Sequence, residues 1–169
     1  MLAVRRRMKI PAYFCVLALL GFSNMTNSQE RGIIGRSYEN DLPVIYKLVD
    51  EIPDQSVRAA LPWLTVISWK YDGSGNNGMP EEALNQSMVQ LERAIENSLL
   101  KPTSCRHAYS RTGNGNKEFV YYISDRDAIM SEFNEALSGH PRYPIEINFY
   151  NDPEWEDFRK LLESFRQTE

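Results

Sequence analysis

The sequence predicts an α+β fold with a ferredoxin-like β-α-β-β-α-β order, an antiparallel sheet with helices on one face, an extra C-terminal helix and an N-terminal hairpin extension. Two observations lead to this prediction. From residue 61 on, strand-like runs that alternate every second residue are interspersed with runs of helical spacing. The middle two strands are joined by a Gly/Asn-rich connection that is typical of a hairpin, which requires antiparallel neighbours.

Residues 1–28 have the pattern of a secretory signal peptide. Basic residues within Arg5–Lys9 precede the apolar segment Ile10–Phe22, and small polar residues follow it. The apolar segment has 13 residues, fewer than the roughly 20 that a helix needs to span a bilayer. We therefore expect a periplasmic or secreted protein; the alternative is an uncleaved leader that anchors it to the membrane. Cleavage after Ser23 or Ser28 and a start at Met1 or Met8 all fit this pattern.

The charge and the cysteines of the remaining body exclude several partners. Without residues 1–28 the chain keeps 15 Lys and Arg against 23 Asp and Glu, a formal charge of −8. Such a body repels phosphate backbones and anionic lipids, so we expect no nucleic acid partner. Cys105 is then the only cysteine left, which excludes an internal disulfide, and we interpret it as a small buried hydrophobic residue.

Residues 29–60 are interpreted as an N-terminal strand extension. Two strand-like runs, Gly32–Tyr38 and Pro43–Ile52, flank a polar turn, and Val57–Ala60 has the composition of a short helical turn. We expect this segment to add strands to an edge of the sheet or to cover an open face. The side chains that share one side of the second strand are Val44, Tyr46 and Leu48.

The ferredoxin-like domain, residues 61–169, begins with the segment that organises it. Leu64–Tyr71 is rich in β-branched and aromatic residues, which favours a central strand. After a Gly/Asn loop, Pro80 suits a first helical position because its missing N–H would lack a partner there. We expect the helix that follows to cover the sheet with an apolar stripe formed by Leu84, Met88, Leu91, Ile95 and Leu99.

The remaining elements follow the same alternation of patterns. Thr103–Ser110 and Lys117–Ser124 predict the two strands of a hairpin. Asp125 is expected to cap a helix, and Tyr143–Tyr150 predicts the last strand. The Asp-Pro pair at 152–153 is then expected to supply the cap and the first-turn proline of the C-terminal helix.

The loop Gly73–Gly78 contains a G-x-G-x-x-G pattern between a strand and a helix, which is the context of a dinucleotide-binding fingerprint. Pro80 places the third glycine outside the helix, whereas the fingerprint places it inside. No acidic residue follows where the next strand would hold a ribose. We therefore interpret the loop as a connection, and a small-ligand binder or enzyme that uses Gly73–Gly78 is an alternative function.

The residues that carry most catalytic and metal chemistry are not grouped in this sequence. His107 lies in mid-strand and His140 in a His-Pro turn, and neither has a second His or Cys at ligand spacing. No serine or cysteine lies in a nucleophile motif, and the carboxylates between Asp125 and Glu135 suit a solvated helix face better than a catalytic pair. The sequence therefore predicts no catalytic residue, no metal and no cofactor, and a protein that is not an enzyme.

A partial RNA-recognition motif leaves a second alternative open. Phe119–Tyr122 matches the F-V-x-Y half of the RNA-binding octamer, whereas Gly115–Glu118 does not match the other half. On an open sheet face Tyr122 and Tyr150 could stack bases, as in that fold. The acidic body and the predicted export oppose this, and a single-stranded RNA binder is retained only as an alternative.

Several short motifs from Leu61 on point to a family. The most specific are Asn77-Gly78-Met79-Pro80 and Asp152-Pro153-Glu154-Trp155. With further runs at Pro62–Leu64, Trp69–Tyr71, Leu91-Glu92, Ser110–Gly115, Glu118–Tyr122 and Pro144-Ile145, about two thirds of the chain resembles the bacterial family called domain of unknown function 695. That family is loosely grouped with the protein inhibitor of ribonuclease E, regulator of ribonuclease activity B. The resemblance implies a ferredoxin-like fold and no catalytic residues. Because ribonuclease E is cytoplasmic, an exported chain is not expected to inhibit it.

Together these observations predict an exported, non-enzymatic module that binds another protein or acts as an accessory domain. Its candidate surface consists of aromatic residues, which are enriched at protein interfaces. These candidate partner-binding residues are Trp69, Tyr71, Tyr122 and Tyr150.

Overall fold

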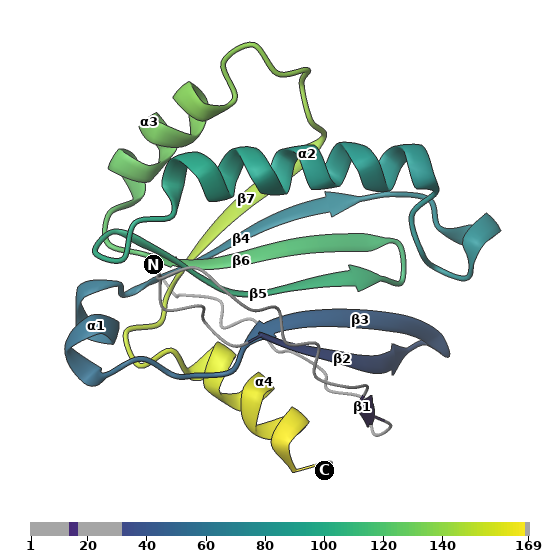
Figure 1. The fold of residues 1–169 in the computed structure, drawn as a ribbon, viewed down its shortest axis with the longest axis horizontal. Coiled ribbons are helices and arrows are strands. Elements are labelled where there is room, and N and C mark those ends of the chain that lie inside the picture. Colours follow the sequence, from purple (N-terminus) through teal and green to yellow (C-terminus); the bar gives the residue numbers. More distant parts are fainter. Residues whose placement is uncertain (1–13, 17–31, 168–169) are drawn as a thin grey trace, which may run out of the picture.

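The chain folds around one antiparallel sheet, and the computed structural model describes residues 14–16 and 32–167 (Figure 1). The sheet has seven strands in the order β1-β2-β3-β5-β6-β4-β7. The strands are β1 (Phe14–Val16), β2 (Gly32–Glu39), β3 (Leu42–Val49), β4 (Trp63–Lys70), β5 (Cys105–Gly113), β6 (Asn116–Ile123) and β7 (Ile145–Asn151). The α-helices are α1 (Gln55–Ala60), α2 (Glu82–Leu99), α3 (Arg126–Ala136) and α4 (Glu156–Arg166), with a 3₁₀ turn at Ser74–Asn76. The predicted α+β class is confirmed.

The strands from β4 on form a split βαβ arrangement within this wider sheet. β4 and β5 are connected by α2 and are separated by β6, which is antiparallel to both. β7 pairs with the other edge of β4. The sheet is wider than the expected four strands because β3 pairs with β5, from Val44 opposite Gly113 to Leu48 opposite Tyr109. The N-terminal hairpin therefore adds strands to an edge, which was one of its two expected arrangements.

Helices cover both faces of the sheet, whereas the sequence predicted them on one face. α2 and α3 pack on the first face, against a core that includes Ile67, Phe119 and Tyr121. α4 packs on the opposite face and lies beside the β2–β3 hairpin (Figure 1). The apolar stripe of α4 needs a surface of its own, because α2 and α3 already occupy the first face. The four fully buried side chains of that stripe are Phe158, Leu161, Leu162 and Phe165.

The start of α4 differs in detail from the expected Asp-Pro cap. The helix begins at Glu156, after Trp155 in a left-handed conformation with a φ of 55°. Asp152 still caps it, since its carboxylate accepts hydrogen bonds from the backbone N–H groups of Glu156 at 2.8 Å and Asp157 at 3.1 Å. The Asp-Pro-Glu-Trp motif is therefore a capping loop that points an indole into the core.

The predicted signal peptide lies outside the described residues, except for the backbone of β1. β1 pairs antiparallel with β2, with Cys15 opposite Arg36 and Val16 opposite Gly35. The signal peptide itself stays a prediction. Within residues 32–167, no helix is both long enough and apolar enough to span a membrane.

Candidate functional site

The structure separates the four aromatic residues that were expected to form a partner-binding surface. Trp69 is 4% exposed and packs against Tyr143 beneath α2, with ring centroids 5.4 Å apart. Tyr122 is fully buried on the opposite face of the sheet. Tyr71 and Tyr150 are only partly buried. Trp69 and Tyr122 are thus core residues and not surface residues, because both faces of the sheet carry a helix.

The sheet face proposed for RNA is covered by α4. Tyr122 stacks on Trp155 with centroids 3.9 Å apart and planes 7° from parallel, which leaves no room for a base. Its hydroxyl donates to Asp152 Oδ2 at 2.6 Å. Burial, together with the nearby Asp152 carboxylate, raises the pKa of Tyr122. This tyrosine therefore holds the cap of α4 in place and is not available for stacking on RNA.

The Gly73–Gly78 loop uses much of its hydrogen-bonding capacity internally. The N–H groups of Asn76 and Gly78 both donate to the Gly73 carbonyl oxygen, at 3.1 and 2.8 Å, and the Ser74 N–H donates to Asp72 Oδ1 at 2.9 Å. The Gly78 carbonyl oxygen accepts the Tyr71 hydroxyl and the Gly115 N–H, both at 3.0 Å. A phosphate cradle needs successive free N–H groups. The loop is instead fastened to the β5–β6 turn, so its geometry gives no support to a nucleotide site.

The histidines and the cysteine do not converge. Burial raises the pKa of the Cys105 thiol to about 12, which suits the expected unreactive hydrophobic role. His140 Nδ1 lies 3.0 Å from the Tyr143 hydroxyl, at the turn before β7. Across residues 32–167 no group of three or more His, Cys, Asp or Glu side chains is placed to hold a metal ion.

A polar cluster, absent from the sequence prediction, lies between α2 and the sheet. Glu92 on α2 is 9% exposed, and its carboxylate oxygens lie 3.8 Å from Lys117 Nζ and 3.9 Å from Lys47 Nζ. The Ser110 and Tyr121 hydroxyls are buried beside it and have no hydrogen-bond partner in the described part of the chain. Glu92 lies on the buried stripe of α2, one turn after Met88. This helical spacing in the sequence is the signal that indicates a buried carboxylate.

Burial dominates the electrostatics of this cluster. It lowers the pKa of Lys117, an effect that the Glu92 carboxylate opposes. It raises the pKa of the Tyr121 phenol well above its usual value. No acid or base lies within hydrogen-bonding distance of the Ser110 hydroxyl, so the cluster lacks the geometry of an activated nucleophile. Its ion pairs fix α2 on the sheet, since breaking one would leave a buried charge.

We expect His107 to make folding stability pH-dependent. Burial lowers its pKa from 6.5 to about 4, so the unfolded chain binds a proton that the native chain rejects. The contribution of His107 to stability is constant above pH 6.5 and is lost as the pH falls toward 4. Urea unfolding of the wild type and of His107→Gln at several pH values tests this. The difference in unfolding free energy between them must shift against the wild type below pH 6.5; a constant difference contradicts the expectation.

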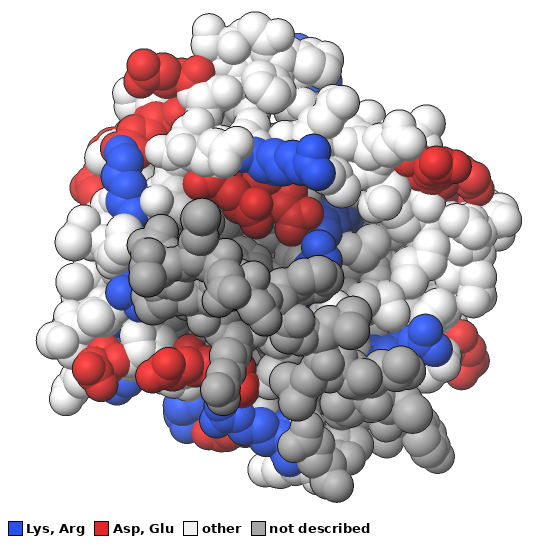
Figure 2. Space-filling view, in the orientation of Figure 1, with Lys and Arg blue, Asp and Glu red and all other residues white. Residues whose placement is uncertain are grey.

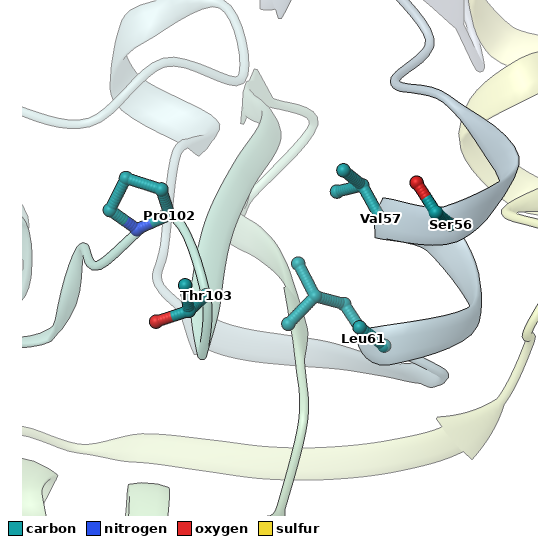
Figure 3. Close-up of a pocket in the computed structure, with 6 residues that line it drawn as sticks. Ser56, Val57, Leu61, Pro102 and Thr103 are labelled. Carbon is teal, nitrogen blue, oxygen red and sulfur yellow. The ribbon is translucent and has the colours of Figure 1, made fainter.

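A small hollow lies between α1 and the connection that precedes β5 (Figure 3). It measures about 190 Å³, below the roughly 300 Å³ at which ordinary ligand pockets begin. Its lining holds two hydroxyl groups, on Ser56 and Thr103, and no charged side chain. Its lining residues are Ser56, Val57, Ala60, Leu61, Pro102 and Thr103.

The most exposed apolar residues of the described chain lie on β2. Ile34 is 49% exposed and Tyr38 is 39% exposed, and Arg36 is exposed between them on the same face. On β3, Lys47 pairs with Ile34 and Ile45 pairs with Arg36. We call these five residues the hairpin face. It lies on the α2 side of the sheet, because Lys47 pairs with Ser110 and Ser110 pairs with Phe119 of the α2 core.

The two outer strands of the domain differ in their protection. β7 carries an exposed Glu146, which accepts a hydrogen bond from Asn148 at 3.1 Å, and β2 carries an exposed Arg36; such charges discourage further pairing. Of the two strands, only β2 also exposes large apolar side chains, Ile34 and Tyr38. Among the residues that the structure describes, β2 is paired on its outer side only over residues 35–37, by β1. The outer edge of β2 is therefore the candidate functional site. The sequence alone did not reveal it, since exposure of Ile34 depends on which strand is outermost.

The fold and this edge define a class of protein, an α+β domain with an open antiparallel sheet. Comparison by sequence identifies the family. The model of a family of unknown function (DUF695) matches residues 36–162, and the chain belongs to that family. No curated protein and no solved structure matches the chain.

Proposed function

We propose that this chain is an exported, non-enzymatic protein-binding module, and that the outer edge of β2 pairs with an extended segment of another protein. The observation that carries the proposal is the exposure of Ile34 at 49% and Tyr38 at 39% on the outermost strand of the sheet from residue 32 on. Native edge strands are usually shielded by charges, prolines or covering segments, because they are templates for pairing. An edge that displays large apolar side chains suits recognition by strand addition.

The pairing of β1 supports this proposal. Phe14–Val16 forms antiparallel pairs with Gly35–Ser37, so the edge has the backbone geometry that an added strand requires. These three residues lie within the predicted signal peptide. Cleavage after Ser23 or Ser28 would remove β1 and leave the edge of β2 open along its whole length. In this proposal, export and binding are thus linked by a single processing step.

Site-specific cross-linking tests the proposal. A photoreactive amino acid at position 38, on the hairpin face, is expected to form an adduct with another protein when the chain is exported and folded. The matched control carries the same amino acid at position 148 on β7, where the edge is protected and no adduct is expected. Sequencing the N-terminus of the exported chain shows whether β1 has been removed.

Two results would contradict the proposal. One is an exported, folded chain that gives no adduct from position 38. The other is equal adducts from positions 38 and 148, since this would indicate nonspecific contact. An additional Ile34→Asp substitution is expected to abolish the position-38 adduct and leave the fold intact, because that side chain is already half exposed.

A further inference from the structure

The charges of the hairpin face indicate the chemistry of the partner segment. The inference drawn from them rests on the proposed function. We infer that the segment that pairs with β2 carries an acidic side chain opposite Arg36 and apolar side chains two positions to either side. On the hairpin face, Arg36 lies between Ile34 and Tyr38, and alternate residues of a strand share one face. An added strand presents its own alternate residues to these three positions.

Two of the carboxylates near the hairpin face, those of Glu39 and Glu92, are already paired. Glu39 accepts hydrogen bonds from Arg111 at 2.6 Å and from the Tyr46 hydroxyl at 3.2 Å, on the other side of the hairpin. Glu92 lies between Lys47 and Lys117. Within residues 32–167, no carboxylate forms an ion pair with Arg36, so its charge is left for an incoming group. Lys47, beyond Ile45, is already paired with Glu92, so Arg36 supplies the unpaired positive charge of the hairpin face. Figure 2 shows acidic and basic side chains interspersed on the face that it draws.

The same charge argues against a second copy of this chain as the occupant. In a symmetric antiparallel pairing centred on residue 35, 36 or 37, the two Arg36 side chains lie directly opposite or diagonal to each other. Like charges at such positions disfavour pairing. A segment of another protein with an acidic residue meets no such repulsion, and its apolar residues cover Ile34 and Tyr38. The occupant is therefore an extended, acidic-apolar segment of a different protein.

Three synthetic peptides provide the probe. Each peptide has nine residues. Val stands two positions before and two positions after the central residue, which is Glu, Ser or Lys. The protein is purified in its exported form, and its N-terminus is determined by sequencing. The affinity of each peptide for this protein is measured by fluorescence anisotropy at low salt. We expect the Glu peptide to bind about fivefold tighter than the Lys peptide, because opposite charges on paired strands attract and like charges repel. In Arg36→Glu the order of the two peptides is expected to reverse.

The control and the contrary outcomes separate this inference from the proposed function. Arg142→Glu, at an exposed position before β7, makes the same charge change at the opposite end of the strand order from β2 and is expected to keep the wild-type order. Equal binding of all three peptides, or no binding of any, overturns the acidic preference. Cross-linking at position 38 reports on strand addition separately. A dimer that dissociates on Tyr38→Asp identifies a second copy as the occupant and also overturns the inference.

Discussion

Trp155→Ala is expected to lower the free energy of unfolding by about 4 kcal/mol, within the range for removing a buried tryptophan. The indole is 1% exposed and stacks on Tyr122 at a centroid distance of 3.9 Å. Its Nε1–H donates to the Leu61 carbonyl oxygen at 3.1 Å, and this buried acceptor loses its donor in the variant. Urea unfolding followed by far-UV circular dichroism measures the loss without relying on tryptophan fluorescence.

Trp155→Phe is the matched control for this prediction. It keeps an aromatic ring against Tyr122 and removes the Nε1–H donor. We expect a loss of about 2 kcal/mol from the unpaired carbonyl and the smaller ring. A loss below about 1 kcal/mol in the alanine variant would mean that the indole does not hold α4 to the sheet.

Gly113→Ala is the second substitution with a large expected effect. Gly113 has a φ of 142°, and a Cβ there would lie 2.2 Å from the Pro43 carbonyl oxygen and 2.8 Å from Val44 Cα. Both contacts are with the backbone of β3, so a side chain at this position pushes the hairpin away from β5. We expect a loss of about 3 kcal/mol in unfolding free energy, because the backbone strain at residue 113 adds to the loss of pairing between β3 and β5. Hydrogen exchange is expected to speed up most in β2 and β3.

Gly139→Ala separates crowding from backbone strain. Gly139 also has a positive φ, of 88°, and nothing lies within 4 Å of an added Cβ. Its replacement is expected to cost about 1 kcal/mol, from the left-handed conformation alone. Equal losses in the two glycine variants would show that the close approach of β3 to β5 contributes nothing.

The elements of the fold could be predicted from the sequence because their patterns are periodic. The Leu84–Leu99 stripe became α2, and the expected cap at Asp125 is present, where Oδ1 accepts the Ala128 N–H at 2.7 Å. The hairpin of β5 and β6 formed where two alternating runs flank a Gly/Asn turn. Helix ends were harder to place, as α4 shows, because Asp152 caps from four residues ahead of the helix.

The assignment of faces could not be made from periodicity. The alternation along β4 and β6 separated Trp69 from Leu64, and Tyr121 from Tyr122, onto two sides of the sheet. It contained no information on whether the second side met solvent or a helix. Since α4 lies about 30 residues after β6 in the chain, its docking face depends on tertiary packing. Tyr122 was therefore expected at a surface and is found in the core.

The candidate site at the outer edge of β2 likewise depends on tertiary packing, which periodicity in the sequence does not reveal. Gly32–Glu39 was recognised as a strand, and its place at the edge follows only from the strand order. The polar cluster had a weak signal in Glu92, which interrupts an otherwise apolar stripe. Its partners Lys47 and Lys117 come from two separate strands, and only pairing across the sheet brings them together.

The packing of α4 against the first hairpin has a consequence for the order in which the chain folds. Phe165 lies against Gly35 and meets the Tyr46 ring at a centroid distance of 5.3 Å, and Arg166 forms an ion pair with Asp50 at 3.0 Å. α4, which is synthesised after every described strand, therefore completes the β2–β3 hairpin. Until α4 has left the ribosome, the apolar side of β2 and β3 lacks the cover that α4 provides, and such long-range closure slows folding. A chain that stops before residue 156 exposes that side permanently and is expected to aggregate or to be degraded.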